Sequence, residues 1–299
     1  MEATLSERGY EQAERITRER AKSFYFASSA LGPATKRAAF AVYAFCRRCD
    51  DAVDEGPREG LEARVAEVRA QLDDAYRGVP QDDPIVAALA ETVRLRAVPR
   101  EAFDDLILGM EQDLTKTRYR TWEELDGYCQ LAAGTVGLMM ASVFGVRETG
   151  ALVHASALGR AMQLTNVLRD VREDLEVHDR VYLPLDALEA GGVHEEHLRA
   201  FSRRGALDDG PEAEAVRAVM REGARRAREL YVQADQGVPS IIPWTGRASV
   251  RLMRATYADI LNVLEARDHD PFLGRASTSR ARKVWVGMSA LLGKREVLA

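Results

Sequence analysis

The sequence predicts an all-α protein that forms one domain. Apolar residues recur at three- and four-residue spacing along nearly the whole chain, and alternating β-branched runs bounded by turn residues are almost absent. The breaks between periodic segments are short by the standard of a linker between domains. With 299 residues the chain can bury a sizeable core, so we expect a single domain over residues 1–299.

The first long helix has the clearest boundaries. Pro33, followed by Ala-Thr-Lys-Arg-Ala-Ala-Phe, has the form of a helix start, and Gly56-Pro57 ends the segment, which predicts a helix over 33–55. Later helices follow from the same periodicity, and breaks rich in Gly, Pro or polar residues separate them. They are predicted over residues 61–77, 84–96, 101–115, 122–145, 151–177, 212–236, 244–266 and 280–292.

Composition and charge exclude several classes of protein. The chain has 42 basic and 47 acidic residues and a formal charge of −5, so no overall positive field exists to bind nucleic acid. No apolar run approaches the ~18 residues that span a membrane, and the N-terminus lacks the pattern of a secretory signal. Three cysteines, Cys46, Cys49 and Cys129, fit a reducing compartment. We therefore expect a cytoplasmic protein without an obligate protein partner.

The first candidate site is an acidic stripe on the first long helix. Tyr43, Arg47, Asp50 or Asp51, and Asp54 fall at steps of four, three and four, so they share one face over three turns. Two carboxylates at this spacing repel one another unless a cation lies between them. Hard oxygen ligands on a rigid scaffold suit Mg²⁺, whose remaining positions are filled by phosphate oxygens and water. The stripe therefore predicts a Mg²⁺ site that meets a phosphate-bearing substrate.

A second stripe repeats this geometry. Gln163, Asn166, Asp170 and Asp174 fall at steps of three, four and four, on a helix whose opposite face is apolar. Acidic pairs at helical spacing are common on solvent-facing sides, so either stripe alone is weak evidence. Two stripes, each extended upstream by polar partners, favour a paired metal site for a diphosphate.

Diphosphate binding also requires cations close to the metal ions. Each candidate, taken singly, is more often a surface charge, and only its position beside an acidic stripe distinguishes it. The candidates are Arg47, Arg169, Arg180 and Arg275, with Lys22 and Ser23 ahead of the first long helix.

The stretch 128–137, Tyr-Cys-Gln-Leu-Ala-Ala-Gly-Thr-Val-Gly, places two glycines inside an apolar helix. Each glycine costs about 1 kcal/mol relative to alanine in a helix interior. Removing side chains lets a neighbouring helix approach closely, or bends the helix and opens a channel for a long apolar ligand. The sequence leaves both alternatives open.

Together these motifs resemble the squalene/phytoene synthase family of head-to-head (1'-1) prenyl synthases. The resemblance is carried by residues 23–28, 43–54, 128–137, 163–174 and 180–184. It implies an isoprenoid-synthase bundle of α-helices around a central cavity, with the two Asp-rich motifs facing each other at the mouth of that cavity.

The resemblance also implies residue roles. Mg²⁺, or Mn²⁺ in its place, would be held by Asp50, Asp51 and Asp54 at one site and by Asn166, Asp170 and Asp174 at the other. The implied catalytic residues are Tyr43, Asp50, Asp54, Tyr128, Asp170 and Asp174, and the implied substrate-binding residues are Ser23, Arg47, Gln163, Asn166, Arg180, Tyr257 and Arg275.

Within the family, segments 133–137 and 163–170 are most similar to bacterial carotenoid enzymes. This implies two geranylgeranyl diphosphates as substrates and phytoene as product, formed through a cyclopropylcarbinyl diphosphate and without NADPH. Because substrates and product are lipids, we expect peripheral contact with the inner face of the cell membrane, although no strongly amphipathic basic helix identifies the contact surface.

Four alternatives remain open. Two are a C30 dehydrosqualene synthase and a presqualene or hydroxysqualene synthase, both acting on farnesyl diphosphate. The third is a head-to-tail prenyltransferase or terpene cyclase, against which the upstream Tyr-x-x-x-Arg step argues. The last is an inactive helical assembly factor, against which the complete set of five aspartates argues.

The chain departs from the family pattern at three places. Arg172 stands where the family often has Gly, the link from Asp174 to Arg180 is one residue longer than usual, and residues 269–272 follow the pattern only loosely. These departures bear on Arg180 and Arg275 as phosphate ligands and leave the acidic motifs intact.

Overall fold

The computed structural model describes residues 3–54, 59–79 and 81–291. Within these ranges the chain forms helices and two isolated bridges but no strand, which confirms the all-α prediction. The helices are α1 (Leu5–Arg20), α2 (Lys22–Ala27), α3 (Pro33–Asp54), α4 (Leu61–Arg77), α5 (Pro84–Arg96), α6 (Arg100–Asp113), α7 (Trp122–Cys129), α8 (Thr135–Phe144), α9 (Ala151–Val177), α10 (Leu185–Ala190), α11 (Glu195–Arg204), α12 (Pro211–Gly237), α13 (Trp244–Glu265) and α14 (Arg280–Leu291).

The predicted helices are present with ends that differ by no more than two residues, except that the predicted ends at residues 55 and 292 lie outside the described residues. Four short or polar helices, α1, α2, α10 and α11, escaped the prediction. The buried positions of α1 are Gly9, Tyr10, Ala13 and Thr17, so its inner face is too small and polar to show a strong apolar period. A capping box between Thr4 and Glu7 nevertheless starts it.

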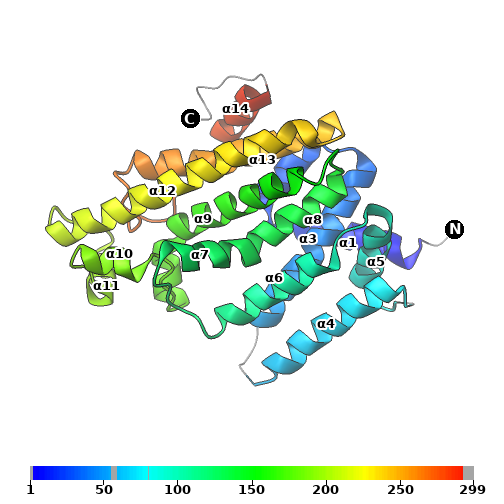
Figure 1. Ribbon diagram of the computed structural model, residues 1–299, viewed down its shortest axis with the longest axis horizontal. Helices are drawn as coiled ribbons and strands as arrows, with labels where there is room; N and C mark the ends of the chain where they lie inside the picture. The colour runs from blue at the N-terminus through cyan, green and yellow to red at the C-terminus, as the bar shows by residue number, and fades with distance from the viewer. Residues whose placement is uncertain (1–2, 55–58, 80, 292–299) are drawn as a thin grey trace.

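Two groups of helices share the core (Figure 1). In one group α3 packs against α1, α4, α5, α6 and α8, with Phe45 and Phe103 in edge contact at its centre. In the other, α9 packs along α12, and α13 lies against both. Because α8 also packs on α9, the two groups meet at the α8–α9 contact. That the chain is a single domain stays a prediction.

The segment predicted as one helix over 122–145 contains a π-helical turn, Gln130–Gly134, between α7 and α8. The segment Trp122–Phe144 is long and apolar enough to span a membrane by length and composition alone, but it packs against α6 and α9 inside the bundle. Its glycines allow a very close approach: a Cβ on Gly137 would lie 2.1 Å from the Ala155 carbonyl oxygen. The close approach left open by the sequence therefore occurs, and the π-helical turn adds a local change of helix geometry. That the glycines bend the helix to open a channel stays a prediction.

The close contact predicts a strong effect of one added methyl group. Gly137→Ala should lower the free energy of unfolding by about 1–3 kcal/mol or more, because the helix backbone must shift to remove the overlap. Gly127→Ala is the matched control: it lies in α7 with nothing within 4 Å of its Cβ position, and it should gain up to about 1 kcal/mol from helix propensity. Urea unfolding measures both. Equal stability of Gly137→Ala and the parent protein would contradict the assigned contact.

Candidate active site

An apolar cavity of about 340 Å³ lies between α3, α8, α9 and α13. Residues of α9 from Ala151 to Asn166 line it, so it follows that helix for about 22 Å at 1.5 Å per residue. Most of the lining is small or aliphatic. Tyr43, Gln163, Asn166 and Tyr257 form a polar group towards the Asn166 end of α9, and Arg20, His154 and Ser249 are the other polar side chains in the lining. The cavity thus has a polar part and a long apolar part, as an amphipathic chain requires.

On α3 the first acidic stripe is paired with a cation of the same helix. Arg47 Nη2 lies 2.5 Å from Asp51 Oδ1, and Arg47 Nη1 lies 3.8 Å from Asp50 Oδ2. Tyr43 stands one turn earlier and lines the cavity. Burial raises the pKa of Tyr43 to about 12, so its phenol stays protonated at neutral pH and can donate a hydrogen bond. The side chain of Asp54 lies outside the described residues.

On α9 the second stripe is paired with two arginines. Arg169 donates to both oxygens of Asp170, at 2.8 Å from Nε and 2.5 Å from Nη2. Arg275, from the segment after α13, reaches the same carboxylate at 3.1 and 3.3 Å and also lies 3.4 Å from Glu173. Asp170 is mostly buried, with 15% of its side chain exposed. The structure therefore brings the predicted Arg275 and Arg169 to the second stripe.

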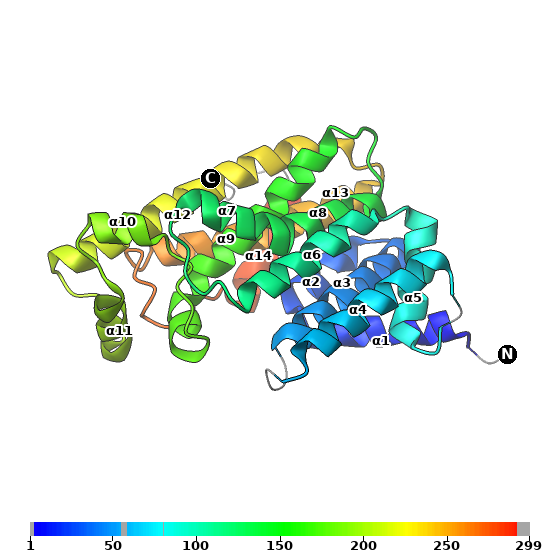
Figure 2. The same cartoon turned by 60° about the horizontal axis from the view of Figure 1, so that its bottom comes forward.

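Tyr257 on α13 connects the two stripes. Its side chain lines the cavity together with Tyr43 of α3 and Asn166 of α9. Burial raises the pKa of Tyr257, while the nearby charge of Arg169 lowers this pKa and that of Asp170 raises it. The acidic residues of α3 and α9 belong to the C-terminal parts of these helices, and the C-terminal ends of both helices lie low in Figure 2. The two predicted motifs thus meet around one cavity.

Two predicted residues, Tyr128 and Ser23, do not line the cavity themselves. Tyr128 belongs to a stack of three buried tyrosines with Tyr119 and Tyr182, and its hydroxyl lies 3.3 Å from that of Tyr182. It approaches the cavity through Gln163, whose Nε2 donates to its hydroxyl at 3.4 Å. Ser23 is half-buried in α2, one residue before Phe24, which lines the cavity. The implied roles of these residues remain predictions.

The longer link before Arg180 is accommodated by a tight turn. Asp179 adopts a left-handed conformation with φ of 51°, and the backbone N–H of Arg180 returns to the Asp174 carbonyl at 2.9 Å. Arg180 and Asp174 line one small pocket. The extra residue therefore does not separate Arg180 from the second stripe.

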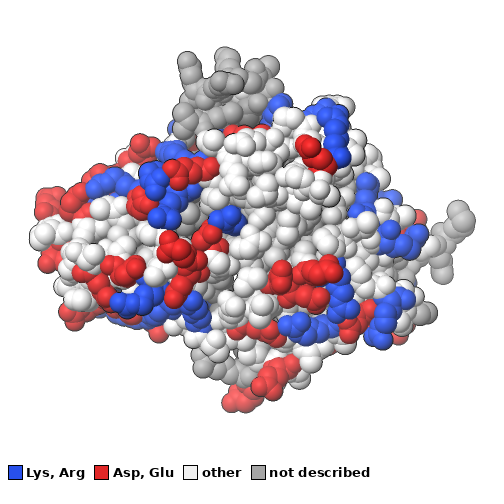
Figure 3. Space-filling view, in the orientation of Figure 1, with Lys and Arg blue, Asp and Glu red and all other residues white. Residues whose placement is uncertain are grey.

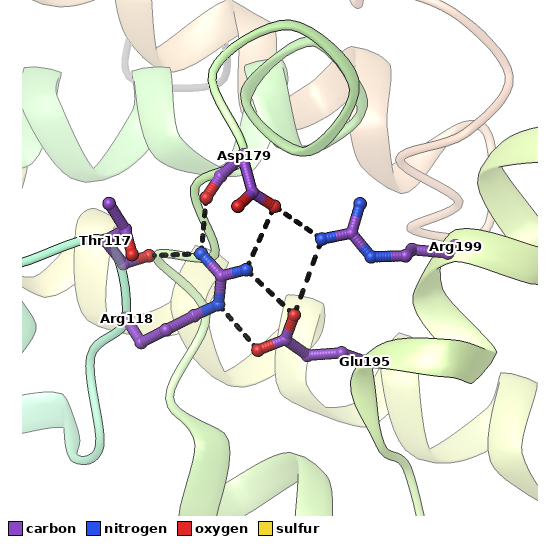
Figure 4. A network of polar contacts seen from close by, with 5 residues as sticks. All are labelled: Thr117, Arg118, Asp179, Glu195 and Arg199. Carbon is purple, nitrogen blue, oxygen red and sulfur yellow. Dashed lines mark hydrogen bonds and ion pairs between the residues drawn. The ribbon is translucent and has the colours of Figure 1, made fainter.

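A polar network fixes that turn (Figure 4). Arg118 donates from Nε to Glu195 at 2.6 Å and from Nη2 to Asp179 at 3.1 Å, and it also bonds the Asp179 carbonyl. Arg199 of α11 lies 2.5 Å from Asp179 Oδ1. Three segments distant in sequence are tied together in this way, and none of these residues was identified from the sequence.

Arg172, the departure from the family pattern, holds the segment that carries Arg275. Its Nη1 donates to the Phe272 carbonyl at 3.2 Å, while its Nε donates to Glu176 at 3.0 Å. Asp270 fixes the same segment by accepting from the backbone N–H of Phe272 and of Leu207, each at 2.8 Å. Hydrogen bonds of Arg172 and Asp270 therefore hold the 269–272 segment in place. The sequence showed that Arg172 departs from the family pattern but not which group it binds.

This arrangement predicts that Arg172 supports substrate binding indirectly, by holding the segment that carries Arg275. Arg172→Ala should raise KM for a prenyl diphosphate about fivefold with little change in kcat, since one anchoring hydrogen bond is lost. Glu176→Ala is the control, because it removes the other partner of Arg172 and leaves the Phe272 contact. Steady-state kinetics compare the two. An unchanged KM in Arg172→Ala would show that Arg275 needs no such support.

The site residues fit a hard divalent cation. Asn166 Oδ1 is buried without a hydrogen-bond partner, although Nδ2 of the same amide donates to Gln163 at 3.3 Å. An unsatisfied buried amide oxygen is costly unless a donor or a cation meets it. In the described part of the chain no three His, Cys, Asp or Glu side chains gather closely enough to hold a metal by themselves. Further ligands would have to come from Asn166, substrate oxygens and water, which suits Mg²⁺.

Comparison with known proteins decides the family. Residues 17–282 match the family model of squalene/phytoene synthase. The chain belongs to the squalene/phytoene synthase family. Among its relatives, the chloroplastic phytoene synthase of Daucus carota is 37% identical over 291 residues, covering 94% of this chain and 69% of the carrot protein. The 15-cis-phytoene synthase of Synechocystis is 36% identical over 293 residues, covering 93% and 83% of the two chains.

Solved structures of the same family show the same fold. A dehydrosqualene synthase in complex with a ligand superposes with a TM-score of 0.85 at 28% identity, over 97% of both chains. A squalene synthase of Alicyclobacillus acidocaldarius gives a TM-score of 0.79 at 27% identity, over 89% of this chain and 96% of that one. These likenesses confirm the predicted isoprenoid-synthase bundle.

Proposed function

We propose that this protein is a prenyltransferase that joins two molecules of geranylgeranyl diphosphate head to head and converts the product to phytoene. The observation that carries the proposal is one cavity whose polar part is lined by Tyr43 of the first stripe and by Gln163 and Asn166 of the second, and which follows α9 for about 22 Å. Phytoene synthases of plants and of a cyanobacterium, 35–38% identical over most of this chain, support it.

In the first step C1 of one chain loses its diphosphate and a proton and forms bonds to both carbons of the C2–C3 double bond of the other chain, which closes a cyclopropane ring. The resulting cyclopropylcarbinyl diphosphate then loses its own diphosphate and a proton as it rearranges to the 1'-1 linked triene. Arg47, Arg169 and Arg275 pair with carboxylates in this structure, and their planar guanidinium groups also suit diphosphate oxygens.

Tyrosines and the apolar wall complete the site. The protonated phenols of Tyr43 and Tyr257 can donate to a diphosphate, and their ring faces can stabilise an allylic cation. The apolar lining keeps water from that cation until the second chain attacks. No reduction occurs in this reaction, so the proposal requires no NADPH.

We propose Mg²⁺, or Mn²⁺ in its place, as the metal ion. Asp50, Asp51 and Asp54 would hold it on α3, and Asn166, Asp170 and Asp174 on α9. When bound, the ion would neutralise charge on the departing diphosphate.

A C30 dehydrosqualene synthase is the second candidate, and the ligand-bound dehydrosqualene synthase structure favours it at the level of fold. The higher identity to phytoene synthases favours the C40 product. An inactive assembly factor is the remaining alternative, although the sequence retains all five aspartates.

Product analysis tests the proposal. Purified protein with Mg²⁺ and without NADPH should convert geranylgeranyl diphosphate to a C40 triene, identified by mass spectrometry of the extracted lipid. Asp50→Ala and Asp174→Ala should each lower the rate at least a hundredfold, whereas Asp105→Ala, an exposed acid of α6, should not. A C30 product from farnesyl diphosphate alone would move the assignment to the second candidate, and no product from either substrate would contradict the enzyme hypothesis.

The length of the cavity predicts how to change the substrate preference. Ala151 lines the apolar end, where α9 begins, and it is buried. Ala151→Phe should shorten the cavity and lower kcat/KM for geranylgeranyl diphosphate at least tenfold relative to farnesyl diphosphate. Val153→Phe, two residues on and 53% exposed, is the matched control. Parallel assays in detergent compare both substrates, and an unaltered preference in Ala151→Phe would mean that the substrate ends elsewhere.

A further inference from the structure

The two inter-helix turns at the apolar end of the cavity form one surface. The turn between α8 and α9 (residues 145–150) and the turn between α12 and α13 (residues 238–243) lie together at the upper right of Figures 1 and 2. The N–H of Ile242 donates to the Gly145 carbonyl, and the N–H of Arg147 donates to the Ser240 carbonyl, each at 2.9 Å. We call this surface, with its neighbours Val153 and Trp244, the two-turn end.

Large apolar side chains are exposed at the two-turn end. Trp244 is 70% exposed, Ile242 55% and Val153 53%. Ile241, which precedes Ile242, and Ala151, two residues before Val153, line the cavity from the inside, as does Val146 of the first turn. A single layer of residues therefore separates the apolar end of the cavity from this exposed apolar surface.

Three arginines belong to the same turns or to the start of α13. Arg147 donates to the Pro239 carbonyl at 3.1 Å, and Arg247 donates to the Ile241 carbonyl at 2.6 Å, so both are fixed beside the turns. Arg251 is exposed one turn after Arg247 on α13.

The acidic residues near these turns are fewer than the arginines, and each has a polar partner. Glu148 accepts a hydrogen bond from Ser240 Oγ at 2.9 Å, and Asp235 pairs with Arg254 at 3.2 Å. In Figure 3 this corner shows basic and acidic groups set in a largely uncharged surface. The two-turn end thus combines exposed Trp and Ile with an excess of arginine, on a chain whose net charge is −5.

We propose that the two-turn end docks on an anionic phospholipid bilayer and that the hydrocarbon product leaves the cavity into that bilayer. Tryptophan is enriched at membrane–water interfaces, and arginines near the surface are attracted to anionic headgroups that repel the rest of an acidic chain. The exit route rests on the proposed function, because only a long apolar product needs it. Docking itself does not, and it can be measured without substrate.

Vesicle flotation of the full-length protein tests the docking. Binding to vesicles of phosphatidylcholine with 30% phosphatidylglycerol should exceed binding to pure phosphatidylcholine, and Trp244→Glu should reduce it at least fivefold. Arg251→Glu should reduce binding only to the anionic vesicles. Trp285→Glu is the matched control, since Trp285 is a 58% exposed tryptophan on α14, and it should bind as the parent protein does.

Activity in detergent separates this inference from the proposed function. Trp244→Glu should keep the parent rate in detergent and lose rate on vesicles. Equal binding of Trp244→Glu and the parent protein, a greater loss in Trp285→Glu than in Trp244→Glu, or no preference for anionic vesicles would each overturn the docking surface. Absence of activity in the parent protein would instead bear on the proposed function alone.

Discussion

Charge repulsion between carboxylates is the constraint on which this site depends. Two helices carry acidic stripes into the same region, and each stripe is stable only because guanidinium groups lie against it: Arg47 on α3, and Arg169 with Arg275 at Asp170. Removing one partner of such a partly buried pair leaves an uncompensated charge, which is far costlier than losing the whole pair. In the proposed function the carboxylates would hold Mg²⁺, and these same arginines would bind diphosphate oxygens.

Helix α9 contributes to more parts of the site and the fold than any one of its contacts suggests. This one helix supplies a wall of the cavity from Ala151 to Asn166 and then continues into Asp170 and Asp174. Its close contact with α8, at Gly137 and Ala155, brings the two groups of helices together. Chain binding, diphosphate binding and fold stability therefore depend on the position of a single element, and the same geometry places the apolar end of the cavity under the two turns that we propose as a membrane contact.

Much of this could be predicted from the sequence because helical periodicity is a local signal. Steps of three and four residues placed Tyr43, Arg47 and Asp50 on one face, and Gln163, Asn166 and Asp170 on another. The short helices α10 and α11 and the network of Arg118, Asp179 and Glu195 could not be predicted, because they depend on contacts between segments far apart in the chain. Arg172 is an example. The sequence showed that it departs from the family pattern, but only the structure shows that it binds the Phe272 carbonyl.

The most direct test of the account is a crystal structure with Mg²⁺ and a thio-analogue of geranylgeranyl diphosphate, whose carbon–sulfur bond ionises poorly. Diphosphate should lie between the two acidic stripes, with Arg47 or Arg275 moved from carboxylate to phosphate and the prenyl chain lying along α9 towards Ala151. A chain bound outside this cavity, or a diphosphate that contacts only one stripe in every bound copy, would contradict it.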